Sequence, residues 1–118
     1  SNFYYVHIAT KADPNAHNVF LVKDAPRTNI ARKTTEGVNW GLNISHVVRL
    51  ERRVADGTIK VWFDDLSDPI MVATDKNFTM GEIGFGSFDD TGRISKIRIW
   101  APAPPVRLRM LLPRWLTH

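Results

Sequence analysis

Residues Ser45 to Asp65, S-H-V-V-R-L-E-R-R-V-A-D-G-T-I-K-V-W-F-D-D, decide the fold of this chain. Two runs rich in Val, Ile, Trp and Phe flank the tripeptide Ala55-Asp56-Gly57, and this arrangement predicts a β-hairpin. Side chains alternate between the two faces of a strand, so one face of the hairpin is mostly charged. The other face is apolar and carries His46, Val48, Leu50, Ile59, Val61 and Phe63. A sheet with one buried side has this pattern.

The register of the hairpin depends on the length of its loop. A two-residue turn at 56–57 would set Arg53 opposite Lys60, and two like charges in that position are unfavourable. A four-residue loop at 54–57 instead sets Glu51 opposite Lys60, which is an attractive pair. We therefore predict the longer loop. The same register pairs Arg49 with Trp62 in a cation–π contact, Leu50 with Val61, and Val48 with Phe63.

The composition is that of a single globular domain. The chain has 118 residues, of which 43% are hydrophobic and 24% are charged. No run reaches the length of about eighteen apolar residues that a membrane span needs, so we expect no membrane partner. The chain has no Cys, which excludes disulfides and a Cys nucleophile. It opens on Ser1 directly before a strand-like run, and we interpret it as an excerpt of a longer protein.

The formal net charge of +4 is concentrated at the C-terminal end. Residues 101–118 hold three arginines and no acidic side chain, whereas residues 1–100 are nearly neutral. A nucleic-acid-binding domain would show a basic stripe with aromatic stacking positions, and the sequence has none. We therefore expect no nucleic-acid partner.

Short strands separated by turn clusters follow one another through residues 1–100, where no helical period extends over ten residues. The predicted strands are Phe3–Ala9, His17–Lys23, Thr28–Arg32, the two hairpin strands, Ile70–Thr74, Met80–Phe88 and Arg93–Trp100. This pattern predicts an all-β sandwich or barrel. Residues 101–105, A-P-A-P-P, form a Pro-rich linker before a basic tail at 106–118. That tail is either a short amphipathic helix or a segment foreign to the domain.

Several motifs resemble the concanavalin A-like, or laminin G-like, jelly rolls. They are Tyr4-Tyr5-Val6-His7, Asn18 to Val22, Ala25-Pro26-Arg27, Gly57 to Asp65 with Pro69, and Gly81-x-Ile83-Gly84-x-Gly86-Ser87-Phe88-Asp89. The chain is most similar to the 3-keto-disaccharide hydrolase-type domain of bacterial secreted proteins, over residues 3–100. This resemblance implies an antiparallel jelly-roll β-sandwich outside the cytoplasm, either periplasmic or secreted. Where such domains often carry a Trp-His pair, this chain has Ser45-His46, so the Trp is missing or replaced by Trp40.

The family domain is nearly twice as long as this chain. The resemblance therefore implies that residues 1–100 are the C-terminal part of a jelly roll, incomplete at the N-terminus. Missing strands would leave apolar inner-face residues uncovered and strand edges open. We accordingly expect the chain to self-associate through exposed strand edges.

One predicted sheet face gathers side chains suited to binding carbohydrate. Aromatic rings stack on sugars, and polar groups fix the hydroxyls. The candidate residues are Tyr5, His7, Asn18 and Arg27, joined by Trp40 from the loop at 34–43. The alternative is that His7 is simply a hydrogen-bonded histidine of the sheet. Zinc would need three or four converging ligands, and His7 and His17 supply only part of such a set.

Three functions stay open at this point. The lectin-like architecture implied by the resemblance favours a module that binds glycan without chemistry. The 3-keto-disaccharide hydrolase resemblance implies cleavage of 3-keto glycosides, for which His7 and His17 are candidate bases, because an unperturbed pKa of about 6.5 suits proton transfer. The third function is a non-catalytic structural or interaction domain of a larger secreted protein.

Acidic residues cluster at two predicted turns, Asp64-Asp65-x-x-Asp68 and Asp89-Asp90. Turn aspartates usually accept hydrogen bonds from nearby backbone N–H groups. Calcium is the alternative, since it binds clustered oxygens in loops, and Asp89 and Asp90 are the candidates. We expect no other cofactor. The alternating Glu-x-Asp-x-x-Glu of the glucanases in this superfamily has no counterpart in the sequence.

Overall fold

The computed structural model describes residues 2–24, 26–80, 83–86, 93–94, 96–100 and 108–110, and within these ranges it contains strands and no helix. The chain divides into two compact units, residues 1–79 and 80–118. The prediction of an all-β fold is thereby confirmed for the described part of the chain.

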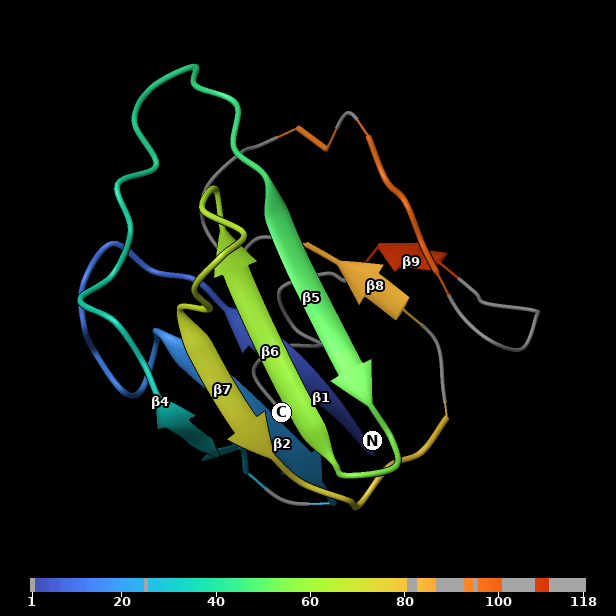
Figure 1. Cartoon of the computed structure of the whole chain (residues 1–118). Helices are drawn as coiled ribbons and strands as arrows, with labels where there is room; N and C mark the ends of the chain where they lie inside the picture. The colour runs from blue at the N-terminus through green and yellow to red at the C-terminus, as the bar shows by residue number, and fades with distance from the viewer. Residues whose placement is uncertain are drawn as a thin grey trace. The chain divides into compact units, whose positions relative to one another are not determined.

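The first unit consists of two antiparallel sheets that lie one behind the other (Figure 1). Sheet A has the order β1-β2-β3 and is formed by β1 (Asn2–His7), β2 (Asn18–Lys23) and β3 (Thr28–Asn29). Sheet B has the order β4-β7-β6-β5 and is formed by β4 (Ala31–Lys33), β5 (Val48–Arg53), β6 (Thr58–Phe63) and β7 (Met71–Thr74). The arrangement is that of a β-sandwich.

The core of this unit lies between the two sheets and follows the period of two that strands impose. Its fully enclosed residues come from β2, β6 and β7 and are Val19, Ile59, Val61, Met71 and Ala73. Tyr4, Val6 and Ile8 pack against them from the first strand and its continuation. At roughly 25 cal/mol per Å² of apolar area removed from water, this shared core is what holds the sheets together.

The hairpin has the predicted register. Glu51 lies opposite Lys60 and Arg49 opposite Trp62, with the guanidinium of Arg49 5.3 Å from the centre of the Trp62 ring. Leu50 pairs with Val61 and Val48 with Phe63, and residues 54–57 form the loop.

The apolar face of the hairpin is buried on β6 but not on β5. Val61 is fully enclosed, whereas Val48 is 48% exposed and Leu50 54% exposed. Among the described strands β5 pairs only with β6, so it forms the edge of sheet B. The prediction of a buried face is therefore wrong for Val48 and Leu50, because the core of the sandwich is built over β6 and β7.

The predicted strand at Thr28–Arg32 is in fact two strands that belong to different sheets. β3 pairs with β2, and β4 pairs with β7, with only Ile30 between them. The N–H of Ile30 still donates to the carbonyl of Val19 on β2, at 2.8 Å. The chain therefore crosses from sheet A to sheet B within a few residues.

In the second unit, β8 (Ile83–Phe85) pairs in parallel with β9 (Leu108–Met110). The helix considered for the tail is wrong at 108–110, where apolar and basic residues alternate with the period of a strand. The predicted strand at 93–100 is wrong for residues 93–94 and 96–100, which lie in no strand. Apolar alternation alone does not supply the neighbouring strand that a ladder requires. The Pro-rich residues 101–105 lie outside the described ranges.

Candidate functional site

Four of the predicted binding residues lie on one face of sheet A. Tyr5 and His7 belong to alternate positions of β1, and His7 lies directly opposite Asn18 of β2. Arg27 reaches the same face, because its Nη1 donates to the hydroxyl of Tyr5 at 2.7 Å. Its guanidinium also lies 4.6 Å from the centre of the Phe20 ring. The structure therefore brings Tyr5, His7, Asn18 and Arg27 together as the sequence predicts.

The polar groups of this face are engaged within the fold. Tyr5 is 7% exposed and stacks on the buried ring of Phe20, with ring centres 4.9 Å apart. Besides its bond to Tyr5, Arg27 donates to the backbone carbonyl of Asn15 at 2.7 Å. These contacts favour a structural role for the Tyr5–Phe20–Arg27 stack, in which both rings are buried and only Arg27 is exposed.

Asn18 is also buried, and its side chain forms hydrogen bonds that link the two sheets. Its Oδ1 accepts hydrogen bonds from the N–H of Val19 and from the N–H of Ala31, both at 2.9 Å. Ala31 is the first residue of β4, so this side chain satisfies a backbone group at the point where the chain changes sheet.

His17 is enclosed and neutral. Its Nδ1 accepts a hydrogen bond from the N–H of Ala9 at 3.0 Å, which requires that nitrogen to be unprotonated. Its Nε2 then carries the proton and donates to the hydroxyl of Thr35 at 3.3 Å. Burial, together with the nearby His7, lowers the pKa of His17 below its usual value. The two ring nitrogens therefore link His17 to Ala9 and to Thr35. The role of His17 as a base stays a prediction.

His7 lies on the same face and is only partly buried. Burial lowers its pKa, the charge of Arg27 lowers it further, and a hydrogen bond with the backbone of Ala16 acts in the opposite direction. The imidazole is consequently neutral at pH 7, which is the form a general base needs. Its catalytic role stays a prediction too.

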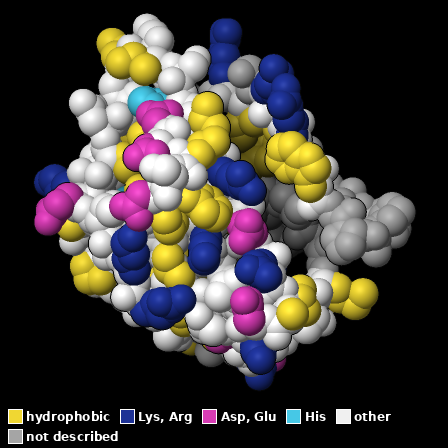
Figure 2. Space-filling model, viewed as in Figure 1, with side chains coloured by type: hydrophobic (Ala, Val, Ile, Leu, Met, Phe, Trp, Pro, Cys, Tyr) yellow, Lys and Arg dark blue, Asp and Glu magenta, His cyan; other side chains and the backbone are white. Residues whose placement is uncertain are grey.

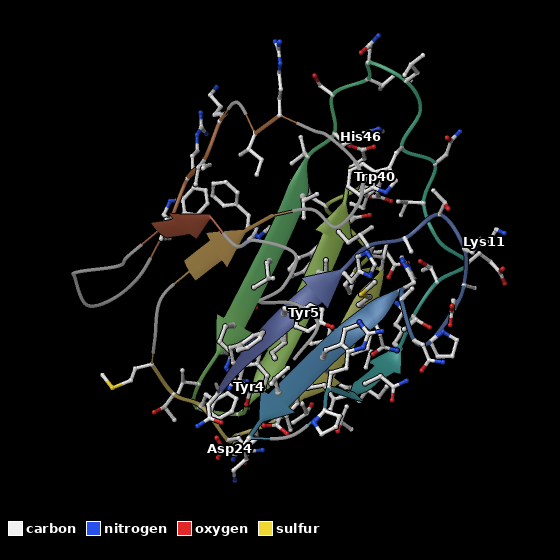
Figure 3. All side chains as sticks on the ribbon, turned by 180° about the vertical axis from the view of Figure 1, so that it is seen from behind. Tyr4, Tyr5, Lys11, Asp24, Trp40 and His46 are labelled. Atoms are coloured by element: carbon white, nitrogen blue, oxygen red, sulfur yellow. The ribbon has the colours of Figure 1, made fainter. Side chains whose placement is uncertain are left out.

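Trp40 belongs to a different cluster, at the end of the hairpin away from its loop. Its ring meets His46 edge-on, with ring centres 5.6 Å apart, and meets Phe63 edge-on at 5.0 Å. His46 in turn stacks on Phe63 at 4.7 Å. Figure 3 shows Trp40 beside His46 and apart from Tyr5, which lies on sheet A. The ring contacts of Trp40 are thus with sheet B rather than with the predicted face of sheet A.

The imidazole of His46 is held between two hydrogen-bond acceptors. Its Nδ1 lies 2.7 Å from Oδ2 of Asp64, and its Nε2 lies 2.5 Å from the backbone carbonyl of Trp40. Because a carboxylate and a carbonyl only accept, both ring nitrogens donate and the ring is an imidazolium. The hydrogen bond to Asp64, and then the one to Trp40, raises the pKa of His46.

The carboxylate of Asp64 is positioned for this contact by its backbone conformation and by a second hydrogen bond. It has a left-handed φ of 60°, and its Oδ1 accepts from the N–H of Val47 at 2.9 Å. The bond from His46 and then the bond from Val47 lower the pKa of the Asp64 carboxyl. Trp40, His46, Phe63 and Asp64, hereafter the Trp40 cluster, therefore combine a fixed aromatic ring with a fixed ion pair.

Sequence reasoning missed the pairing of His46 with Asp64. It placed His46 on the apolar face of the hairpin and Asp64 in a turn. The signal was present in the predicted register, since one step beyond Val48 and Phe63 it sets Val47 opposite Asp64. The N–H of Asp64 indeed donates to the carbonyl of Val47 at 2.8 Å, which leaves His46 next to the carboxylate.

The remaining acidic residues of this turn have partners within the fold. Oδ1 of Asp65 accepts from the N–H of Ser67 at 2.9 Å and from its hydroxyl at 2.6 Å, as turn aspartates do. Asp68 forms an ion pair with Lys33 at 2.9 Å. Within the described ranges no three His, Cys, Asp or Glu side chains converge as metal ligands would. Asp89 and Asp90 lie outside those ranges, so calcium binding there stays a prediction.

The chain matches no known family model, no curated protein and no solved structure. In the part of the chain that the structure describes, no helix has the length and apolar character needed to cross a membrane.

Proposed function

We propose that this chain is a carbohydrate-binding domain that holds glycan without converting it, with Trp40 as the stacking surface. The observation that carries the proposal is the geometry of Trp40. Its ring is fixed edge-on against two neighbouring rings, and 37% of the residue is exposed. An aromatic side chain held in one orientation with a free surface is suited to stack on a sugar ring.

Polar groups beside Trp40 support the same function. The side chain of Asp64 is 49% exposed and is already held by two hydrogen bonds, so its remaining acceptor capacity faces solvent in a fixed place. Carboxylates in such positions accept hydrogen bonds from sugar hydroxyls. Figure 2 shows a histidine beside acidic side chains at this end of the molecule, next to exposed hydrophobic side chains.

The resemblance to jelly rolls supports the same function. We propose that the two sheets of the first unit form part of a jelly roll, lacking strands at its N-terminus, in a protein exported from the cytoplasm. Exposed apolar residues on the loop before the hairpin, Leu42 at 85% and Ile44 at 61%, enlarge the accessible surface beside Trp40. Hydrolysis of 3-keto glycosides would use His7 or His17, and the buried position of His17 and the partial burial of His7 favour it less.

The test is glycan binding by the full chain, measured by calorimetry and by NMR titration against a broad glycan panel. We expect the substitution Trp40→Ala to weaken binding by about 1–2 kcal/mol, or roughly 5–30-fold, through loss of the aromatic surface. The matched control is Trp62→Ala, on the opposite face of the same hairpin, which should retain affinity. If no glycan binds, or if both variants bind as the parent does, the proposal is wrong.

A further inference from the structure

The edge of β5 presents a regular row of backbone hydrogen-bonding groups. In an antiparallel pair, alternate residues bond to the neighbouring strand and the others point away from it. The hydrogen bond from Asp64 to the carbonyl of Val47 identifies the odd-numbered residues of β5 as those directed at β6. The N–H and C=O groups of Val48, Leu50 and Arg52 therefore point away from β6, towards the edge of sheet B where the described strands supply no further partner. Figure 1 shows β5 as the last strand of this sheet.

The side chains along this edge are accessible. Val48 and Leu50 lie on the inner face of sheet B and are about half exposed, at 48% and 54%. On the outer face the side chains of Arg49 and Glu51 are 54% and 35% exposed and lie 3.7 Å apart. Figure 2 shows basic and acidic side chains interleaved on the viewer's side of the sheet. A second strand placed along β5 would meet both kinds of surface.

We propose that β5 pairs antiparallel with β5 of a second copy of this chain, about a two-fold axis that passes beside Leu50. In this register Leu50 faces Leu50 of the second copy, and both residues direct N–H and C=O groups across the interface. Arg49 then faces Glu51 of the second copy, and Glu51 faces its Arg49, so the two cross-strand pairs are both attractive. The two four-stranded sheets join into one continuous sheet.

The charges on β5 select this register over its neighbours. Moving the axis one residue towards the N-terminus sets Arg49 opposite Arg49 of the second copy. Moving it one residue towards the C-terminus sets Glu51 opposite Glu51. Like charges directly opposite one another are unfavourable. The order Arg-Leu-Glu is therefore complementary to itself only when Leu50 lies on the axis, as an isologous interface requires.

The first experiment measures the mass of the full chain by sedimentation over a wide range of concentration. We expect a concentration-dependent shift from the monomer mass of 13.4 kDa to about twice that value, weakened by added salt. A chain that stays monomeric at every concentration would overturn the proposal.

Charge variants then test the register. Arg49→Glu and Glu51→Arg each place like charges across the interface, and each should raise the dimer dissociation constant at least 10-fold. An equimolar mixture of the two variants should recover the dimer, because each strand then meets its opposite. The double variant, in which the two charges are exchanged, should also dimerise by itself.

Thermal melting of each variant controls for loss of folding. The control for charge is Lys11→Glu, at an exposed position outside every strand, and we expect it to dimerise as the parent does. If the single-charge variants dimerise as the parent does, or if the mixture fails to recover the dimer while each variant remains folded, this interface is excluded. Failure of glycan binding would leave these outcomes unchanged, since Trp40 lies outside β5.

Discussion

Tyr4 joins the two sheets through a hydroxyl group with several partners. It donates to Oδ1 of Asp75 at 2.5 Å and accepts from the N–H of Phe78 at 3.2 Å. Arg52 lies over its ring at 4.8 Å and donates to the carbonyl of Phe78 at 2.8 Å. Burial raises the pKa of the Asp75 carboxyl, but bonds donated by Tyr4 and Asn77 outweigh it and hold that pKa below the usual value. A single residue of β1 thereby contacts the segment that follows β7.

We expect this contact to make the free energy of unfolding decrease at acidic pH. A carboxyl with a lowered pKa in the folded state contributes stability above its unfolded value of 3.8, and the contribution is lost as pH falls through the folded value. Tyr4→Phe should lower the free energy of unfolding at pH 7 by about 1 kcal/mol, since solvent screens the pair. Urea unfolding between pH 2 and 7 measures both effects. Equal loss at pH 2 and pH 7 would contradict the assignment.

The hydrogen bonds of His46 should make the stability of the fold depend on pH with the opposite sign. Its pKa is raised in the folded state, so its contribution is complete below the usual value of 6.5 and is lost as pH rises through the folded value. Above that value Nε2 or Nδ1 loses its proton and one of the two acceptors loses its donor. We expect the indole N–H resonance of Trp40 to shift with the titration of His46 in NMR spectra. In His46→Gln the shift should be absent, and its persistence would contradict the link.

At the scale of elements, Asn18 controls the change of sheet at Ile30. Replacing it by Ala leaves the buried N–H of Val19 and the partly buried N–H of Ala31 without their acceptor. We expect a loss of about 1–3 kcal/mol in the free energy of unfolding, measured by urea denaturation. The matched control is Asn29→Ala on the next strand, which should cost less, because it removes only an exposed hydrogen bond from Nδ2 to the carbonyl of Pro14. A similar loss in both variants would assign no special role to Asn18.

Some elements are predicted from the sequence and others are not. The difference depends on whether the contacts that determine an element lie within one short segment or join distant ones. The hairpin register is predicted because Glu51 and Lys60 decide it within one short segment. The sheet change at Ile30 is missed because it depends on a side chain from another strand. The exposure of Leu50 is missed because an apolar pattern does not reveal which strand ends a sheet.

The candidate site follows the same division. The grouping of Tyr5 with His7 is predicted by alternation along one strand, and Arg27 is expected beside them from its place in the sequence. The burial of Tyr5 against Phe20 depends on packing that alternation does not describe. Trp40 is predicted to be a binding residue, but its position is set by His46 and Asp64, whose contact spans the whole hairpin. Residues fixed by neighbours in sequence are therefore predictable, and those fixed by tertiary contacts are not.

At the scale of the whole molecule, the two ends of sheet B are unlike each other. β5 is six residues long and regular, whereas β4 at the opposite end has three residues and slips in register against β7 between Ala31 and Lys33. Such an interruption is unsuitable as a template for another strand. If β5 pairs with a second copy, the joined sheet therefore has an irregular β4 strand at each of its two edges. Polymerisation through sheet B should stop at two chains, giving a particle of finite size rather than a filament.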